Sequence, residues 1–258
     1  MKTLFAAILI AFVFGFTVCK GDVNPGAPMY SPAEILKSNN TFISYIGQNL
    51  NLLSENLTAY DTNGKIISKL EFLKQLTTGR YLFLRLNSTD GKVYFKLYKL
   101  RSRAELAQGD VVYAYTRFVY DDYQKVGKRF PAFDFTDING NRYTSENTRG
   151  KILVIKYWFI GCQTCEQEMP ELNKLVQRYK NREDILFISI APDSKEKLQA
   201  FFKRTRFDYI NVYGQHDLIK NTLKLQAAPT HLIINKQGVI VNVVDNPEEI
   251  DYTLKHDL

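Results

Sequence analysis

The chain has 258 residues, of which 45% are hydrophobic and 24% are charged, and its formal net charge is +7. This composition excludes fibrous and wholly disordered proteins, and a chain of this length can bury a core without disulfides. Its three cysteines are too few for a disulfide framework, so each is interpreted separately. Basic and acidic residues are interleaved and no nucleic-acid motif is present, so we expect a solvated basic surface and no nucleic-acid partner.

The N-terminus carries the first specific pattern. Met1 and Lys2 precede an uncharged apolar stretch over residues 4–18. This pattern predicts a signal peptide over 1–19, because the apolar stretch is too short to span a bilayer comfortably. We therefore expect an exported protein of the periplasm or cell envelope, where disulfides form and persist.

Cys19 stands where this segment ends and leaves two alternatives open. Lipidation of Cys19 would attach the mature chain to a membrane, whereas ordinary cleavage nearby would release it. Val18 stands where bacterial lipoprotein signals usually carry a small residue before the cysteine. The two alternatives differ in membrane attachment and not in chemistry.

Residues 20–30, rich in Gly and Pro, are interpreted as a linker to a small α+β domain over 31–123. This domain holds no cysteine, no histidine and no carboxylates at catalytic spacing, so the sequence assigns it no function.

Two local patterns predict its elements. Capping-box spacing from Ser68 predicts the start of a helix, and Gly79 is placed to end it. Aromatic and branched runs over 80–86 and 92–98 flank an Asp-Gly dipeptide, which predicts a β-hairpin.

A second domain is predicted over 127–258, where apolar runs alternate with helical periodicity. Strands that alternate with helices and end in a hairpin predict an α/β fold, with a central mixed sheet flanked by helices. An Asn-Gly turn near its start predicts a first hairpin. The main strands are expected over 151–159, 185–190, 209–212, 230–234 and 239–244, and the helices over 162–179, 194–204 and 216–223.

The chemistry centres on Cys162 and Cys165, which open a predicted helix directly after an apolar strand. The partial positive charge and free N–H groups of a helix N-terminus stabilise a thiolate. In this geometry Cys162 is the exposed nucleophile that attacks a substrate disulfide, and Cys165 resolves the mixed disulfide. Glu168 shares a side of the helix with the pair and is predicted to carry a proton to or from Cys165. Pro170 is expected to kink this helix.

Two other interpretations of the pair are weaker. A zinc site would need two more ligands, and the remaining cysteine and the three histidines are scattered along the chain. A structural disulfide across four residues would constrain little chain. The pair is therefore predicted to be redox-active, with no metal and no organic cofactor.

From about Gly127 onward, the sequence resembles the thioredoxin superfamily, in particular the exported thiol–disulfide oxidoreductases of the TlpA/ResA type. The resemblance implies a thioredoxin-like fold, protein disulfides or dithiols as substrates, and an upstream electron donor. It also implies that the loop Ala228-Pro229-Thr230 carries a cis-proline facing the active site, and that this loop, Trp158 and Gly161 bind substrate. The matching motifs are Phe130-Pro131-Ala132-Phe133, Gly150-Lys151, Trp158, the cysteine pair, Glu168, Pro170 and Ala228-Pro229-Thr230.

The sequence departs from this family at three places. Gly161 stands where the family often has Trp, and the dipeptide Gln163-Thr164 lacks a proline that many relatives carry. Because this dipeptide influences the reduction potential, the potential of a relative cannot be transferred to this chain.

Lys156 is the third departure, since it aligns with a buried acid of thioredoxins. A lysine in an apolar strand is costly unless it is paired. Two alternatives follow: Lys156 reaches Glu168 or the Cys165 thiolate and lowers the pKa of that thiol, or it extends to solvent from the strand edge.

These observations predict a thiol–disulfide oxidoreductase, with reduction of protein disulfides in the cell envelope as the favoured direction. Two alternatives stay open. One is a peroxide-reducing, peroxiredoxin-like enzyme on the same fold, with an antioxidant role. The other is a non-enzymatic binding module on a thioredoxin scaffold.

Overall fold

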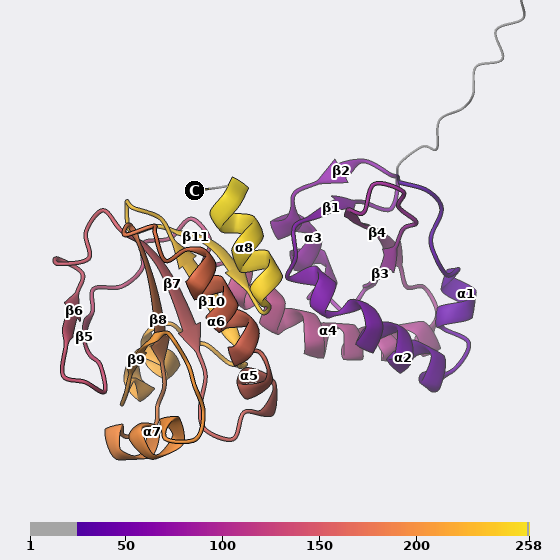
Figure 1. Cartoon of the computed structure of the whole chain (residues 1–258). Helices are drawn as coiled ribbons and strands as arrows, with labels where there is room; N and C mark the ends of the chain where they lie inside the picture. Colours follow the sequence, from indigo (N-terminus) through magenta and orange to yellow (C-terminus); the bar gives the residue numbers. More distant parts are fainter. Residues whose placement is uncertain (1–24, 257) are drawn as a thin grey trace, which may run out of the picture.

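The computed structural model describes residues 25–256 and residue 258. The predicted signal peptide, Cys19 and the first part of the predicted linker lie outside the described residues. The described strands form a four-stranded N-terminal sheet, a five-stranded C-terminal sheet and a separate two-stranded sheet. The long helix α4 (Arg103–Tyr123) runs from beneath the N-terminal sheet towards the five-stranded C-terminal one (Figure 1). Within the described part of the chain, no helix is long and apolar enough to cross a membrane.

The N-terminal sheet has the strand order β2-β1-β4-β3. β3 pairs antiparallel with β4, which confirms the predicted hairpin, whereas β1 pairs parallel with β4. The hydroxyl of Ser68 accepts the N–H of Glu71 at 3.1 Å, so the predicted cap begins helix α3. The bounds are α1 Pro32–Ile35, α2 Asn39–Asn49, β1 Leu57–Tyr60, β2 Ile66–Ile67, α3 Lys69–Leu76, β3 Tyr81–Arg85 and β4 Val93–Lys99.

Helix α4 crosses this part of the fold at a point where only glycine fits. A Cβ atom on Gly109 would lie 1.9 Å from the carbonyl oxygen of Gly79, and backbone cannot move aside cheaply. We expect Gly109→Ala to lower the free energy of unfolding by about 1–3 kcal/mol or more, because overpacking forces backbone shifts.

A matched control is Gly47→Ala in helix α2, where an added Cβ would meet no atom within 4 Å. This substitution should instead raise the free energy of unfolding by about 0.5–1 kcal/mol, because alanine favours helix over glycine. Urea unfolding of both variants measures the contrast. Equal effects of the two substitutions would refute the proposed close approach.

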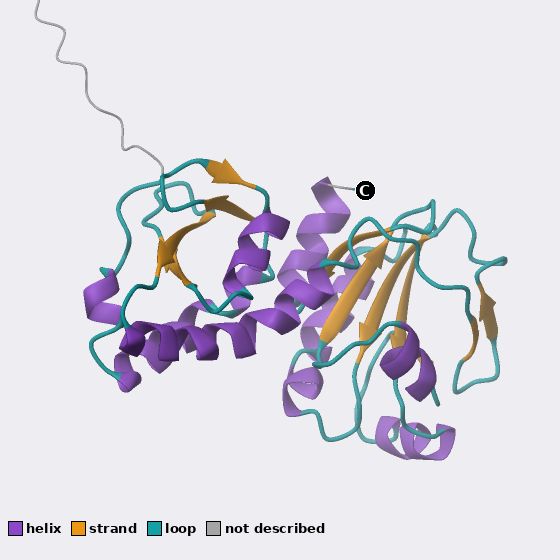
Figure 2. Ribbon diagram, turned by 180° about the vertical axis from the view of Figure 1, so that it is seen from behind, coloured by secondary structure: helices purple, strands orange, loops and turns teal. Residues whose placement is uncertain are grey.

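The C-terminal sheet has the order β11-β10-β7-β8-β9, with β7, β8 and β9 parallel and β10 antiparallel to both of its neighbours. This mixed sheet with flanking helices confirms the predicted fold class (Figure 2). The bounds are β5 Asp134–Thr136, β6 Arg142–Thr144, β7 Ile152–Tyr157, α5 Gln163–Gln167, α6 Met169–Arg178, β8 Ile185–Ile190, α7 Lys195–Phe202, β9 Ile210–Val212, a π-helix Leu218–Thr222, β10 Thr230–Ile234, β11 Ile240–Val244 and α8 Pro247–His256.

Successive side chains of β7 point to opposite faces of the sheet, and this alternation determines which of them face helix α6. Ile152 and Val154 belong to the hydrophobic cluster that contains side chains of α6, α7 and α8. Leu153 and Ile155 belong to the cluster on the opposite face, with side chains of the π-helix. Because successive side chains of a strand point to opposite faces, Lys156 points to the face that carries α6.

The predicted helix over 162–179 is divided in two. α5 ends at Gln167 and α6 begins at Met169, with Glu168 at the junction. Pro170 occupies the first turn of α6, where its missing N–H costs least. Glu168 keeps helical dihedral angles at this junction, so the chain continues from α5 into α6 with Glu168 one turn after Cys165.

Polar contacts link residues around the N-terminal sheet to residues around the five-stranded C-terminal sheet. Ser54 donates a hydrogen bond to Asp245 at 3.1 Å, and Gln226 donates one to Asp121 of α4 at 3.2 Å. A cavity of about 100 Å³ lies between α4 and the loop around Pro229, with Phe118 among its lining residues. The division into domains over 31–123 and 127–258 stays a prediction, but α4 places residues of the first segment beside the Pro229 loop.

Candidate active site

The strand β7 leads through a short loop into α5, whose N-cap residue is Cys162. Cys162 and Cys165 form a disulfide, with their Cα atoms 5.3 Å apart. The exposed fraction of Cys162 is 8%, whereas Cys165 is fully buried. Cys162 is therefore the more accessible residue of the pair, although in the oxidised pair it is far less exposed than the sequence analysis expects of a nucleophile.

Gly161 is required by the backbone of the loop before Cys162. Its φ of +91° lies in the region that side-chain-bearing residues rarely adopt, although an added Cβ would meet no atom within 4 Å. Its N–H donates to the Glu166 carboxylate at 2.9 Å, and the Ile160 N–H donates to Asp193 at 3.1 Å. The absence of a tryptophan at position 161 therefore has a conformational reason in this chain.

The loop at 228–230 lies beside the pair. The Ala228–Pro229 bond is cis, and the carbonyl oxygen of Ala228 lies 3.8 Å from the sulfur of Cys162. The Thr230 hydroxyl donates to the carbonyl of Ala227 at 2.8 Å, and Thr230 is itself buried. The Ala228 carbonyl is thus the group of this loop nearest to the reacting sulfur among the contacts that the structure describes.

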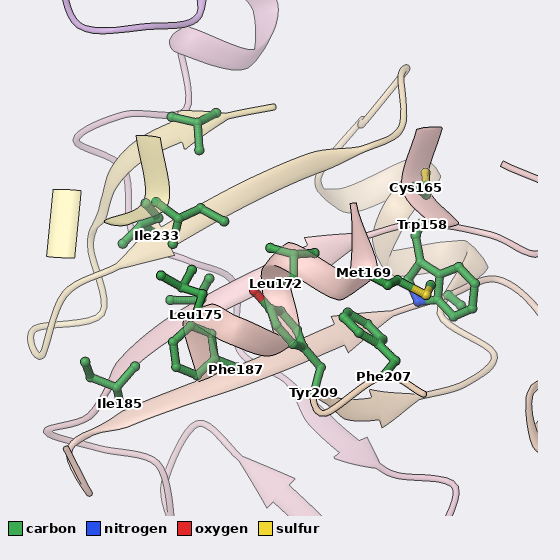
Figure 3. Packing of buried hydrophobic residues seen from close by; sticks show 14 of the residues in the cluster. Trp158, Cys165, Met169, Leu172, Leu175, Ile185, Phe187, Phe207, Tyr209 and Ile233 are labelled. Carbon is green, nitrogen blue, oxygen red and sulfur yellow. The ribbon is translucent and has the colours of Figure 1, made fainter. Parts of the chain in front are cut away.

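Trp158 requires a correction, because the sequence analysis assigns it to substrate binding and the structure buries it fully. Its indole N–H donates to Ser189 at 3.2 Å, and its ring packs against Phe201 and Phe207. Figure 3 shows Trp158 within the same cluster as Cys165 and Met169. In this structure Trp158 therefore lies in the core with Cys165 and not at the surface that a substrate contact would need.

Lys156, Glu168 and His231 meet at the junction of α5 and α6, one helical turn after Cys165. Lys156 is fully buried and forms an ion pair with Glu168. The alternative in which Lys156 extends to solvent is therefore wrong. His231, on the neighbouring strand β10, is the register partner of Lys156, and its Nε2 lies 3.2 Å from Oε1 of Glu168. Three titratable side chains from three elements thus converge in the protein interior.

Their pKa values shift for identifiable reasons. Burial alone would raise the pKa of Glu168, but the hydrogen bond with His231 and the charge of Lys156 together hold it below its ordinary value. Burial lowers the pKa of Lys156, opposed by the charge of Glu168. Burial also lowers the pKa of His231. At neutral pH the group therefore contains an ionised carboxylate beside a neutral imidazole.

The sequence analysis missed His231, which it treats only as a scattered histidine. The available signal is its position two residues after Pro229, on a strand that the hairpin prediction places in the sheet. Among the residues that the structure describes, no group of three or more His, Cys, Asp or Glu side chains is arranged to hold a metal ion.

Comparisons with known proteins agree with this geometry. The model of the AhpC/TSA family matches residues 126–243. The chain is 28% identical over 120 residues to the thiol-disulfide oxidoreductase ResA of Geobacillus kaustophilus. The aligned residues cover 46% of this chain and 68% of the relative. It is 24% identical over 141 residues to ResA of Bacillus thuringiensis subsp. konkukian, which covers 54% of this chain and 82% of the relative.

Solved structures give similar matches to half of the chain. A thiol-disulfide oxidoreductase from Bacteroides fragilis is 20% identical with a TM-score of 0.46, covering 51% of this chain and 100% of the other. The thioredoxin domain of a thiol-disulfide oxidoreductase from Bacteroides vulgatus is 22% identical with a TM-score of 0.45, covering 50% of this chain and 95% of the other.

The family match and the curated relatives confirm the resemblance that the motifs indicate. Residues 126–243 match the model of the AhpC/TSA family, and the fold of this part of the chain is thioredoxin-like. The protein is a thiol–disulfide oxidoreductase, and its sequence is similar to that of ResA.

Proposed function

We propose that the protein reduces protein disulfides in the cell envelope by cycling the Cys162–Cys165 pair between dithiol and disulfide. The observation that carries this proposal is the disulfide itself, which joins the slightly exposed Cys162, beside the Ala228 carbonyl, to the fully buried Cys165. An accessible sulfur is needed to attack substrate, and a nearby protected sulfur is needed to release it.

The exchange has two balanced steps. The Cys162 thiolate attacks one sulfur of a substrate disulfide, so a bond forms between Cys162 and substrate while the other substrate sulfur leaves as a thiolate and takes a proton from water. Cys165 then passes its proton to Glu168 and attacks Cys162, and the second substrate sulfur leaves as a thiolate. The substrate gains two electrons and the pair loses two, which a dithiol donor must return.

Other residues have supporting roles in this proposal. Gly161, Ala228 and Pro229 hold the substrate backbone next to Cys162, and Thr230 fixes the loop through its bond to Ala227. Lys156 keeps Glu168 ionised. The proposed location outside the cytoplasm rests on the apolar stretch before Cys19, with lipidation of Cys19 and ordinary cleavage nearby as the two alternatives.

The reduction potential of the pair tests the direction of electron flow. For a reductase we expect about −250 mV or lower, measured by equilibrating the protein with defined thiol buffers and trapping free thiols. A value between about −120 and −180 mV would instead indicate an oxidase or isomerase. Consumption of hydrogen peroxide at a rate that depends on Cys162 would favour the peroxide-reducing alternative, and a pair that does not cycle would favour the binding module.

A further inference from the structure

The buried histidine on β10 has no role in the mechanism above. His231 is fully buried, and its Nδ1 has no hydrogen-bond partner among the described residues. A buried polar atom without a partner carries a free-energy cost, so packing alone does not account for a histidine at this position. Its other nitrogen, Nε2, lies 3.2 Å from Oε1 of Glu168.

We propose that His231 is a positioning residue whose Nε2–H holds the Glu168 carboxylate ionised and oriented to accept the proton of Cys165. The inference rests on the proposed disulfide exchange and extends it to a side chain on β10. An ionised carboxylate only accepts hydrogen bonds, so the contact requires the proton to be on Nε2. The unpartnered Nδ1 then carries the lone pair of a neutral imidazole.

The contacts of Glu168 leave one of its oxygens available. Lys156 and His231 both approach the same oxygen, Oε1. Oε2 accepts no hydrogen bond from the part of the chain that the structure describes, and Glu168 follows Cys165 by one turn of helix. In the resolving step the proton leaves the Cys165 sulfur for Oε2, while His231 and Lys156 keep their own protons and hold Oε1 in place.

The other groups that face this carboxylate do not replace His231. Tyr209 has a buried hydroxyl without a described partner, and burial together with the charge of Glu168 raises its pKa well above the ordinary value, so it stays neutral. Asp245 faces His231 from the end of β11, and burial raises its pKa. Lys156 supplies a positive charge to Glu168 from β7, the strand on the other side of β10 from β11. Loss of the His231 donor should therefore raise the pKa of Glu168.

The test compares His231→Leu with His231→Gln, whose amide N–H can donate to Oε1. The reduced protein is mixed with an excess of a small disulfide, and release of the second substrate thiol is followed in a single turnover between about pH 3 and 9, a range that includes the acid limb of the wild type. For His231→Leu we expect the acid limb of the profile to shift upwards by about one pH unit, with about tenfold slower release on that limb. At high pH the rate should approach that of the wild type.

His231→Gln should restore the wild-type profile to within about half a pH unit. A His231→Leu profile that superimposes on a wild type that cycles would overturn the role of His231 and leave the proposed function intact. A wild type that releases no thiol would overturn the proposed function itself. If His231→Leu does not fold, His231→Asn takes its place, since its shorter side chain is polar but does not reach Oε1.

Discussion

Replacing Cys162 by Ser should lower turnover of protein disulfides by more than about 1,000-fold, because the sulfur that attacks substrate is removed. Replacing Cys165 by Ser should have a different result. The attack by Cys162 remains, but no buried sulfur is left to displace the substrate, so mixed disulfides accumulate on Cys162. Non-reducing electrophoresis and mass spectrometry of the trapped adducts measure this difference directly.

The double substitution of Cys162 and Cys165 by Ser is the control for this pair of variants. It should form no adduct and show no turnover, while its helices give the far-UV circular dichroism of the wild type. The two single variants would contradict the assigned order of the sulfurs if adducts accumulated on Cys165 in Cys162→Ser. Full biological activity of the double variant would favour the binding module instead.

Replacing Lys156 by Met should lower the free energy of unfolding by about 3–5 kcal/mol, because it leaves the buried carboxylate of Glu168 without its cation. The pKa of Glu168 lies below its ordinary value in the folded protein. The pair therefore stabilises the fold above the pKa of an unfolded glutamate, about 4.3, and this contribution is lost as the pH falls through the folded pKa. Urea unfolding at pH 7 and at a pH below 4 measures both effects.

The matched control is the double variant Lys156→Met/Glu168→Gln. Removing both charges should recover a large part of the lost stability, because a buried pair replaced as a whole is often neutral. The difference between the single and double variants should also shrink at acid pH, where Glu168 is protonated in both states. A Lys156→Met variant as stable as the wild type at pH 7 would show that the cation is not what compensates Glu168.

The sequence predicts the C-terminal half well because its signals are local. The apolar run that ends in Ile190 predicts β8 with its observed bounds. The Asn139-Gly140 turn places the β5–β6 hairpin, and the turn Lys236-Gln237-Gly238 places the β10–β11 hairpin. The cysteine pair and the cis-proline at 229 follow from a resemblance carried by short motifs. In each case the residues that determine the structure are neighbours in the chain.

The parts that sequence reasoning missed depend on tertiary packing. The buried positions of helix α4 are Gly109, Val112 and Thr116, so two of the three residues at helical spacing are not apolar and the stripe is weak in the sequence. The burial of Trp158 and the contact of His231 with Glu168 arise because separate strands and helices meet in space. No pattern over a short window of sequence contains that information.

The complete burial of Lys156 has a consequence for how the enzyme responds to ionic strength. The surface carries most of the +7 formal charge, and mobile ions screen it over about 8 Å at physiological salt. Salt therefore acts on the rate at which charged substrates encounter the protein. The Lys156–Glu168 pair lies where mobile ions do not enter, so the proton-transfer chemistry proceeds in an environment that the surrounding medium scarcely alters.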